Sequence, residues 1–205
     1  MENQNNVNLV GKLIELKKAW ISQEHVMTEG IIQVIRSSGY ADCLPVLFLD
    51  VEATVGSILQ IEGQFRSRDI DNNGKLKVEL YIYAKNVSVV SSEDNINAVE
   101  LEGYVCKKPI LRTTPSGKQI SDLLVACNFN KDKTAYIPVV VWGKCARKVG
   151  KYSVGTKIKI QGRMQSRKYT KVVDNEVKDF VAYELSANSV EEVWINRINI
   201  LLGRI

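Results

Sequence analysis

The sequence predicts an all-β protein made of two copies of a small barrel or sandwich, with one short helix in the second copy. Two observations lead to this prediction. The run 55–68 (VGSILQIEGQFRSR) is repeated at 154–167 (VGTKIKIQGRMQSR), so the chain of 205 residues contains an internal repeat. Within each copy, hydrophobic residues mostly recur at every second position, which is typical of strands that bury one face.

Shorter matches extend the repeat over most of the chain. Residues 9–13 resemble 101–105, residues 44–46 resemble 137–139, and residues 84–87 resemble 187–190. The offset grows from 92 to 103 residues, so the second copy has the longer loops. A period this long indicates two domains rather than a solenoid. We expect domains over 1–92 and 96–193, with the polar run 91–95 as the linker between them.

The individual elements are clearest in the second copy. Alternation marks 120–128, 135–142, 157–164 and 180–187 as strands, and turn signals lie at 115–117, 154–155 and 174–175. Residues 144–152 place Cys145, Val149 and Tyr152 on one side, which predicts the single helix. The first copy has no room for that helix between residues 49 and 55.

Charge is distributed unevenly between the two copies. The chain has a net charge of +5, but residues 1–95 carry nine Lys and Arg against thirteen Asp and Glu, a net charge of −4. Residues 96–205 carry nineteen against ten, a net charge of +9. This asymmetry indicates an anionic partner for the second half only.

Several classes of protein are excluded by composition. No apolar run approaches the roughly 18 residues of a membrane helix, and the N-terminus lacks a signal-peptide pattern. The four cysteines form no CxxC pair, His25 is the single histidine, and there is no phosphate-binding glycine-rich loop. The acidic residues at 174–179 fit a charged turn. We therefore expect no catalytic residue, no metal and no cofactor, and a reducing cytoplasm as the location.

The second copy carries the side chains that binding of single-stranded nucleic acid requires. Cations must follow the phosphates, and flat rings must stack on the unpaired bases. In the strand 135–142, Tyr136 and Trp142 share the face opposite to the aliphatic residues. We expect both rings to face outward and stack on bases. The alternative is that Trp142 packs under the helix or against another subunit.

Two further segments combine an aromatic ring with cations. Tyr169 lies in a run with four cations, which are Arg163, Arg167, Lys168 and Lys171. Phe129 ends a strand close to Lys131 and Lys133. We expect base stacking by both rings and phosphate contacts by these cations. The alternatives are a solvated hairpin for the first segment and a core position for Phe129.

The order of the motifs resembles one known family. Residues 111–118 (LRTTPSGK), 135–146 (AYIPVVVWGKCA), 155–157 (GTK) and 161–169 (QGRMQSRKY) are similar to bacterial and phage single-stranded DNA-binding proteins. They correspond there to the turn after the first strand, the third strand with the helix start, and the fourth strand with its hairpin. The resemblance covers roughly residues 98–193. It implies two tandem OB-folds, which are five-stranded Greek-key barrels that bind oligonucleotides.

The resemblance also implies roles for individual residues. It puts Tyr136, Trp142 and Tyr169 at base-stacking positions. It puts a set of cations along the path of the DNA strand, namely Arg112, Lys118, Lys144, Arg163, Arg167 and Lys168.

The first copy departs from the family pattern. Simple offsets put Cys43, Leu49 and Ile70 where the second copy has its three stacking aromatics. Arg66 and Arg68 are retained, with acidic residues nearby. We expect a degenerate OB-fold whose main role is structural: it pairs with its sister domain, builds an oligomer or docks a protein. The alternative is weak nucleic-acid binding through Arg66 and Arg68.

The last segment, 194–205, is apolar, whereas many family members end in a flexible tail with an acidic tip. We expect this segment to pack on the barrel or on a partner chain.

The sequence therefore favours a non-enzymatic protein that binds and protects single-stranded DNA without sequence preference, in replication, recombination or repair. Two alternatives stay open: a primosome-like assembly module that binds proteins, and a protein that binds single-stranded RNA. Family members generally assemble four OB-folds, so the resemblance implies a homodimer. Replication or repair proteins are further candidate partners, and neither a membrane nor a small-molecule substrate is expected.

Overall fold

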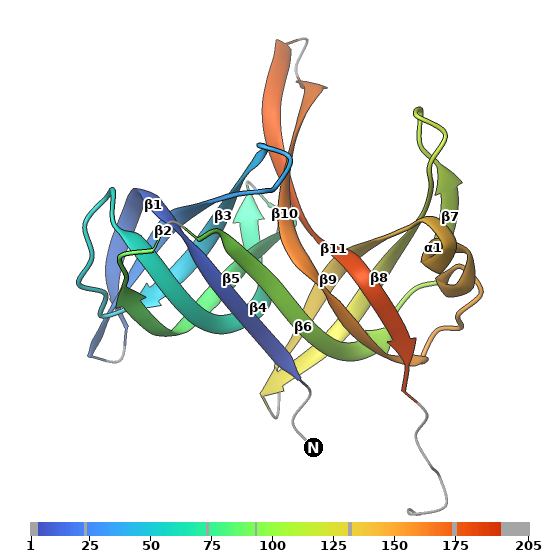
Figure 1. The fold of residues 1–205 in the computed structure, drawn as a ribbon, viewed down its shortest axis with the longest axis horizontal. Coiled ribbons are helices and arrows are strands. Elements are labelled where there is room, and N and C mark those ends of the chain that lie inside the picture. The colour runs from blue at the N-terminus through green and yellow to red at the C-terminus, as the bar shows by residue number, and fades with distance from the viewer. Residues whose placement is uncertain are drawn as a thin grey trace, which may run out of the picture.

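Two β-barrels lie next to each other and share one continuous sheet (Figure 1). The computed structural model describes residues 4–22, 24–72, 74–92, 94–130, 133–173 and 176–193. The first barrel consists of β1 (Asn5–Ser22), β2 (His25–Ile35), β3 (Ala41–Leu49), β4 (Ile58–Asn72) and β5 (Lys75–Val89). The second consists of β6 (Ile96–Val105), β7 (Ile110–Thr113), β8 (Gln119–Asn130), β9 (Lys133–Trp142), α1 (Gly143–Val149), β10 (Lys157–Val173) and β11 (Glu176–Glu192).

Both barrels close with the same strand order. In the first, the order β1-β2-β3-β5-β4 returns to β1, and in the second, β6-β8-β9-β11-β10 returns to β6. All neighbours are antiparallel except β3 with β5 and β9 with β11. The short strand β7 pairs with β8 at the edge of the second barrel. This is the Greek-key order of an OB-fold. The prediction of two tandem OB-folds with one short helix in the second is confirmed.

Alternating hydrophobic residues fill the barrel interiors, as the sequence predicts. On β9, Ile137, Val139 and Val141 are buried to 2% exposure or less. Val46 and Phe48 on β3 are equally buried in the first barrel. Because successive side chains of a strand point to opposite faces, these positions leave the other face of each strand for contacts outside the core.

The helix α1 lies across the end of the second barrel, and its position agrees with the prediction. Gly143 takes a φ of +63°, which turns the chain from β9 into the helix. The helix buries Ala146 and Val149 against the barrel. It ends at Val149, earlier than predicted, and Tyr152 packs on the core from the turn that follows.

The two barrels are joined by antiparallel pairing of β1 with β6. The ladder runs from Asn5 opposite Leu101 to Val10 opposite Ile96. Leu9 and Leu101 occupy equivalent positions of the repeat, as do Asn5 and Asn97. In the ladder Asn5 faces Leu101 and Leu9 faces Asn97, so each contact recurs with the two strands exchanged, about a local two-fold axis at the pair of Val7 with Val99.

An asparagine stabilises the point where each strand leaves its own barrel. The ladder between β1 and β4 stops at Val7, and the Asn5 side chain then exchanges two hydrogen bonds of 2.8 Å with the backbone of Phe65. Asn97 does the same for Met164, at 2.7 and 3.0 Å. Each amide group thus replaces the missing backbone partner, so no peptide group of these residues loses its hydrogen bond at the crossing.

Glycines in the repeated motif allow the barrels to close tightly. The ladder is irregular at Gly63 and at Gly162. A Cβ atom at Gly63 would lie 2.4 Å from the carbonyl oxygen of Tyr83, and one at Gly162 would lie 2.2 Å from that of Ser186. No larger residue fits either place, because both contacts are with backbone.

Two serines connect the barrels a second time with the same symmetry. The backbone N–H of Tyr136 on β9 donates to the Ser67 hydroxyl on β4, at 2.8 Å. The backbone N–H of Cys43 on β3 donates to the Ser166 hydroxyl on β10, at 3.1 Å. Strand β4 of the first barrel therefore binds β9 of the second, and β10 of the second binds β3 of the first. These contacts join the two barrels into one unit.

The hairpin of β10 and β11 extends beyond the barrel, and the β7–β8 turn extends on the same side of the view (Figure 1). Among the described residues, no helix is long and apolar enough to cross a membrane.

Replacing Asn5 by Ala should lower the free energy of unfolding by about 1–3 kcal/mol, because the substitution leaves the buried backbone groups of Phe65 without partners. Asn6 is the matched control, since it lies next in the same strand and is exposed. Asn6→Ala should change stability by less than about 0.5 kcal/mol. Urea unfolding measures both, and equal effects of the two substitutions would refute the structural role given to Asn5.

Candidate nucleic-acid interface

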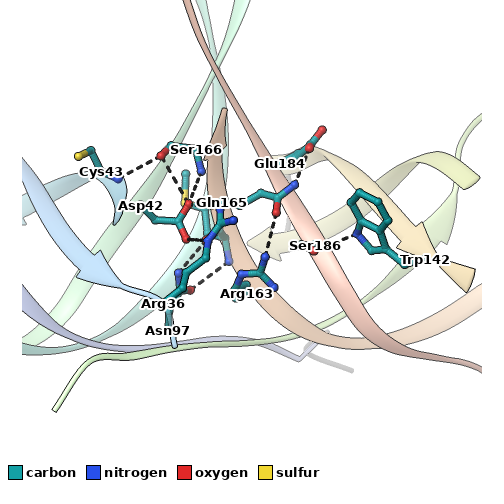
Figure 2. A network of polar contacts seen from close by, with 11 residues as sticks. Arg36, Asp42, Cys43, Asn97, Trp142, Arg163, Gln165, Ser166, Glu184 and Ser186 are labelled. Atoms are coloured by element: carbon teal, nitrogen blue, oxygen red, sulfur yellow. Dashed lines mark hydrogen bonds and ion pairs between the residues drawn. The ribbon is translucent and has the colours of Figure 1, made fainter. Parts of the chain in front are cut away.

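Trp142 is the last residue of β9 and is exposed on the outer face of the second barrel. The residue is 41% exposed, and the indole Nε1 donates to the Ser186 hydroxyl at 3.2 Å (Figure 2). The hydrogen bond fixes the orientation of the ring while part of its surface stays open to solvent. The prediction of an outward ring therefore agrees with the structure, and the alternative position under α1 does not.

A cleft of about 570 Å³ lies beside Trp142 and is lined by both barrels. It brings together Trp142, Arg112 and Arg167, which were predicted from distant parts of the sequence. The first barrel adds Arg36 and Tyr40, which the sequence analysis did not single out. The cleft thus combines aromatic rings with several guanidinium groups, which is the chemistry of a site for an anion that carries flat bases.

Arg112 lies on β7 and pairs with Asp122 on β8. Its Nε donates to one carboxylate oxygen of Asp122, and its Nη2 donates to the other at 3.1 Å. Both side chains are about half exposed, so the pair orders the guanidinium without removing it from solvent. Two further predicted cations, Lys118 in the β7–β8 turn and Lys144 at the start of α1, are both exposed.

Tyr169 lies on the projecting β10–β11 hairpin. Its ring stacks on Phe180 with a centroid distance of 5.6 Å, and the Arg167 guanidinium lies 5.5 Å from the Tyr169 centroid. Tyr169 remains 39% exposed, and the neighbouring Lys168 and Lys171 are exposed. Phe180 supports the tyrosine ring from behind, so the hairpin presents a fixed ring with cations around it.

Tyr136 lies near the other end of β9 from Trp142 and is 49% exposed. Six residue steps along a strand put their Cα atoms about 20 Å apart. They therefore cannot stack on one base, and they mark two places along the face of β9.

Phe129 is half-buried and packs partly against the core. The guanidinium of Arg66, from the first barrel, lies 4.5 Å from the Phe129 centroid and 3.9 Å from that of Tyr83. Burial lowers the pKa of Arg66. The Arg66 guanidinium thus lies over the Phe129 ring and connects the two barrels at this point. Lys133 nearby in the chain is exposed, and Lys131 lies outside the described residues.

Arg163 differs from the other predicted cations because it is partly buried between the barrels. It lines a second cleft, together with Arg36, Asp42 and Asn97. Its Nη2 donates to Gln165 at 3.2 Å, and its Nε has no hydrogen-bond partner among the described residues. Burial, and then repulsion by Arg36, lower the pKa of Arg163. This guanidinium therefore takes part in the junction more than in the exposed surface.

The centre of the junction is a buried carboxylate, Asp42, which Figure 2 shows between the barrels. Arg36 donates to its two oxygens at 2.6 and 2.5 Å, and the backbone N–H of Ser166 donates to Asp42 at 2.8 Å. The Asp42 side chain is 1% exposed, and that of Arg36 is 24% exposed. The hydrogen bond to Asp42 raises the pKa of Arg36. This ion pair links β2 and β3 of the first barrel to β10 of the second.

A sequence signal for Arg36 and Tyr40 existed. The run 36–40 (RSSGY) has a cation, a turn and an aromatic ring, which is the combination that pointed to the β10–β11 hairpin. The sequence did not predict a role for this run, because the repeat does not show which part of the second barrel the turn contacts.

Nothing in the described residues resembles a metal centre, since they contain no group of three or more His, Cys, Asp or Glu that could hold an ion. Burial raises the pKa of Cys127 to about 11, so this thiol stays protonated at neutral pH.

Comparisons with known proteins agree with this description. Residues 96–193 match the model of the Single-strand binding protein family. The Single-stranded DNA-binding protein of Clostridium tetani is 39% identical over 100 residues, which cover 40% of this chain and 69% of that protein. Single-stranded DNA-binding protein 2 of Listeria monocytogenes is 34% identical over 103 residues, which cover 47% of this chain and 62% of that protein.

A solved structure matches nearly the whole chain. The wild-type single-stranded DNA binding protein from Thermus aquaticus has a TM-score of 0.77, with 96% of both chains covered and 19% sequence identity. At this identity the match supports the fold alone. It includes both barrels, whereas the family model covers only the second.

Asp42→Asn should lower the free energy of unfolding by about 3 kcal/mol, because it leaves the partly buried Arg36 without its counter-charge. Asp122→Asn is the matched control, since it breaks an Arg–Asp pair that is exposed, and it should cost less than about 1 kcal/mol. Thermal and urea unfolding report the difference. A loss at Asp42 no larger than at Asp122 would contradict the role of the junction.

Proposed function

The chain belongs to the single-strand binding protein family, and on that premise we propose that it binds single-stranded DNA without sequence preference. One observation carries the proposal: Trp142 is held at its edge by Ser186 and lies exposed in a cleft with Arg112 and Arg167. A ring fixed in this way can stack on any base, since every base has a flat face. The guanidinium groups beside it attract the phosphates of the same strand.

The remaining predicted residues extend this surface. We propose that Tyr136 and Tyr169 provide further stacking positions, because both rings are exposed on strands of the second barrel and Tyr169 is stacked on Phe180. Exposed cations around them would contact phosphates, namely Lys118, Lys133, Lys144, Arg167, Lys168 and Lys171. We keep Phe129 as a weaker candidate, because its ring is half-buried and packs against the core.

We propose that the two barrels have different roles. The second, over 96–193, holds most of the strand, and its excess of positive charge supports this assignment. The first, over 1–92, mainly supports the second and builds the assembly. The predicted packing of 194–205 on a barrel or partner lies outside the described residues.

Further parts of the proposal concern the protein in the cell. We propose that it protects single strands during replication, recombination or repair in the cytoplasm, with no enzymatic step. We also propose a homodimer with four barrels, and a light-scattering mass equal to one chain would contradict this. Competition between poly(dT) and poly(U) of equal length separates DNA binding from RNA binding.

Poly(dT) should quench the fluorescence of Trp142, because a base in stacking contact with the indole quenches its excited state. Trp142→Ala should raise the dissociation constant by about 5-fold to 150-fold, which corresponds to the 1–3 kcal/mol of one stacked base. Trp142→Phe should bind more tightly than Trp142→Ala but lose the quenching. Trp20→Phe is the matched control and should retain both binding and quenching. Unchanged quenching in Trp142→Phe would rule out stacking at this residue.

Affinity should fall steeply with salt, since bound phosphates release their counterions. For single strands, the slope of log K against log salt is about −0.7 for each phosphate that the protein neutralises. Lys168→Ala should make the slope shallower by about 0.7 if Lys168 binds one phosphate. Lys85→Ala, on the exposed face of β5 in the first barrel, should leave the slope unchanged. Identical slopes for wild type and Lys168→Ala would exclude that contact.

A further inference from the structure

The turn between β2 and β3 of the first barrel reaches the surface of the second barrel. Figure 1 shows this turn beside β10, and its residues Arg36 and Tyr40 line the same cleft as Trp142. We propose that Tyr40 is a further base-stacking residue, so that the strand bound at Trp142 continues across the junction onto the first barrel. This inference rests on the proposed function, and it gives the first barrel a direct part in binding.

The turn is held by hydrogen bonds of its own backbone. The backbone N–H of Arg36 donates to the carbonyl of Tyr40, and that of Gly39 donates to the carbonyl of Arg36, both at 2.8 Å. Gly39 adopts a φ of +81°, which a residue with a side chain rarely takes. Binding would therefore not have to order this turn, and the loss of affinity that accompanies such ordering is avoided.

The side chains of the turn are fixed to the second barrel as well. Arg36 is bound by both oxygens of Asp42, which in turn accepts a hydrogen bond from the backbone of Ser166 on β10. The Arg36 guanidinium lies over the Tyr40 ring, 4.6 Å from its centroid. The position of Tyr40 relative to the cleft is thus set by a chain of contacts that begins at a buried carboxylate.

Tyr40 has the exposure that a stacking residue needs. It is 45% exposed although Arg36 covers part of it, a value between those of Trp142 (41%) and Tyr136 (49%). An exposed ring that is held by a guanidinium offers a flat, electron-rich surface next to a positive charge. Bases stack on such surfaces, and the cation favours the phosphates on either side.

The equivalent turn of the second barrel is arranged differently. Phe129, at the start of the β8–β9 turn, faces Arg66 of the first barrel, and that guanidinium is also close to Tyr83. Both rings carry a guanidinium, but Phe129 is half-buried and packs against the core, whereas Tyr40 is 45% exposed and borders an open cleft. Among the described residues of the two equivalent regions, Tyr40 is therefore the ring that is available to a base.

The test uses the full chain and poly(dT), titrated at several salt concentrations. Tyr40→Ala should weaken binding by fivefold or more, within the range of about 5-fold to 150-fold for one lost stack, at every salt concentration. Tyr40→Phe should bind like the wild type, because the ring is kept. Tyr81→Ala is the matched control: it removes a tyrosine that lies 5.1 Å from Arg68 in the same barrel, outside the cleft, and should leave affinity unchanged.

A second measurement does not depend on a loss of binding. In a Trp142→Phe background, Tyr40→Trp should restore quenching by poly(dT), because the new indole would stack on a base. The role of Tyr40 is overturned if Tyr40→Ala binds with wild-type affinity or if Tyr40→Trp shows no quenching. If Trp142→Ala binds weakly in the same experiments, the proposed function stays intact. Failure of the wild type to bind poly(dT) at low salt overturns both.

Discussion

The antiparallel pairing of β1 with β6 is the interaction on which the rest of the structure depends. It places the two barrels about a local two-fold axis, and the paired asparagines Asn5 and Asn97 complete the hydrogen bonding where each strand leaves its own barrel. Because the barrels are fixed in this way, β3 of the first binds β10 of the second through Asp42 and Ser166, and the preceding turn lies beside β10. The cleft beside Trp142 exists only in this arrangement, since residues of both barrels line it.

Duplication has preserved the frame of the barrels and changed their surfaces. The backbone-supporting groups Ser67 and Ser166 are the same in both copies and make equivalent contacts. The outward position that holds Tyr136 on β9 holds Cys43 on β3, and the charges of the two halves have opposite sign. The predicted stacking positions and the excess of positive charge therefore occur in the same barrel, which supports the proposal that this barrel holds most of the strand.

Local features of the fold were predictable from the sequence. Alternation identified the buried face of β9 and the exposed rings of Tyr136 and Trp142, because burial of a strand follows a period of two residues. The pairing of β1 with β6 was not predictable, since a repeat describes each barrel and not the edge at which they meet. For the same reason, the sequence could not show that Arg163 turns into the junction or that Arg66 covers Phe129.

Photocrosslinking of the full chain to poly(dT) that contains 5-iododeoxyuridine tests the central claim most directly, because this base reacts with the aromatic ring on which it stacks. The account predicts crosslinks at Trp142, Tyr136 and Tyr169 of the second barrel and at Tyr40 across the junction. Crosslinks confined to the other aromatic residues of the first barrel, or their absence from Trp142 when poly(dT) is bound, would contradict it.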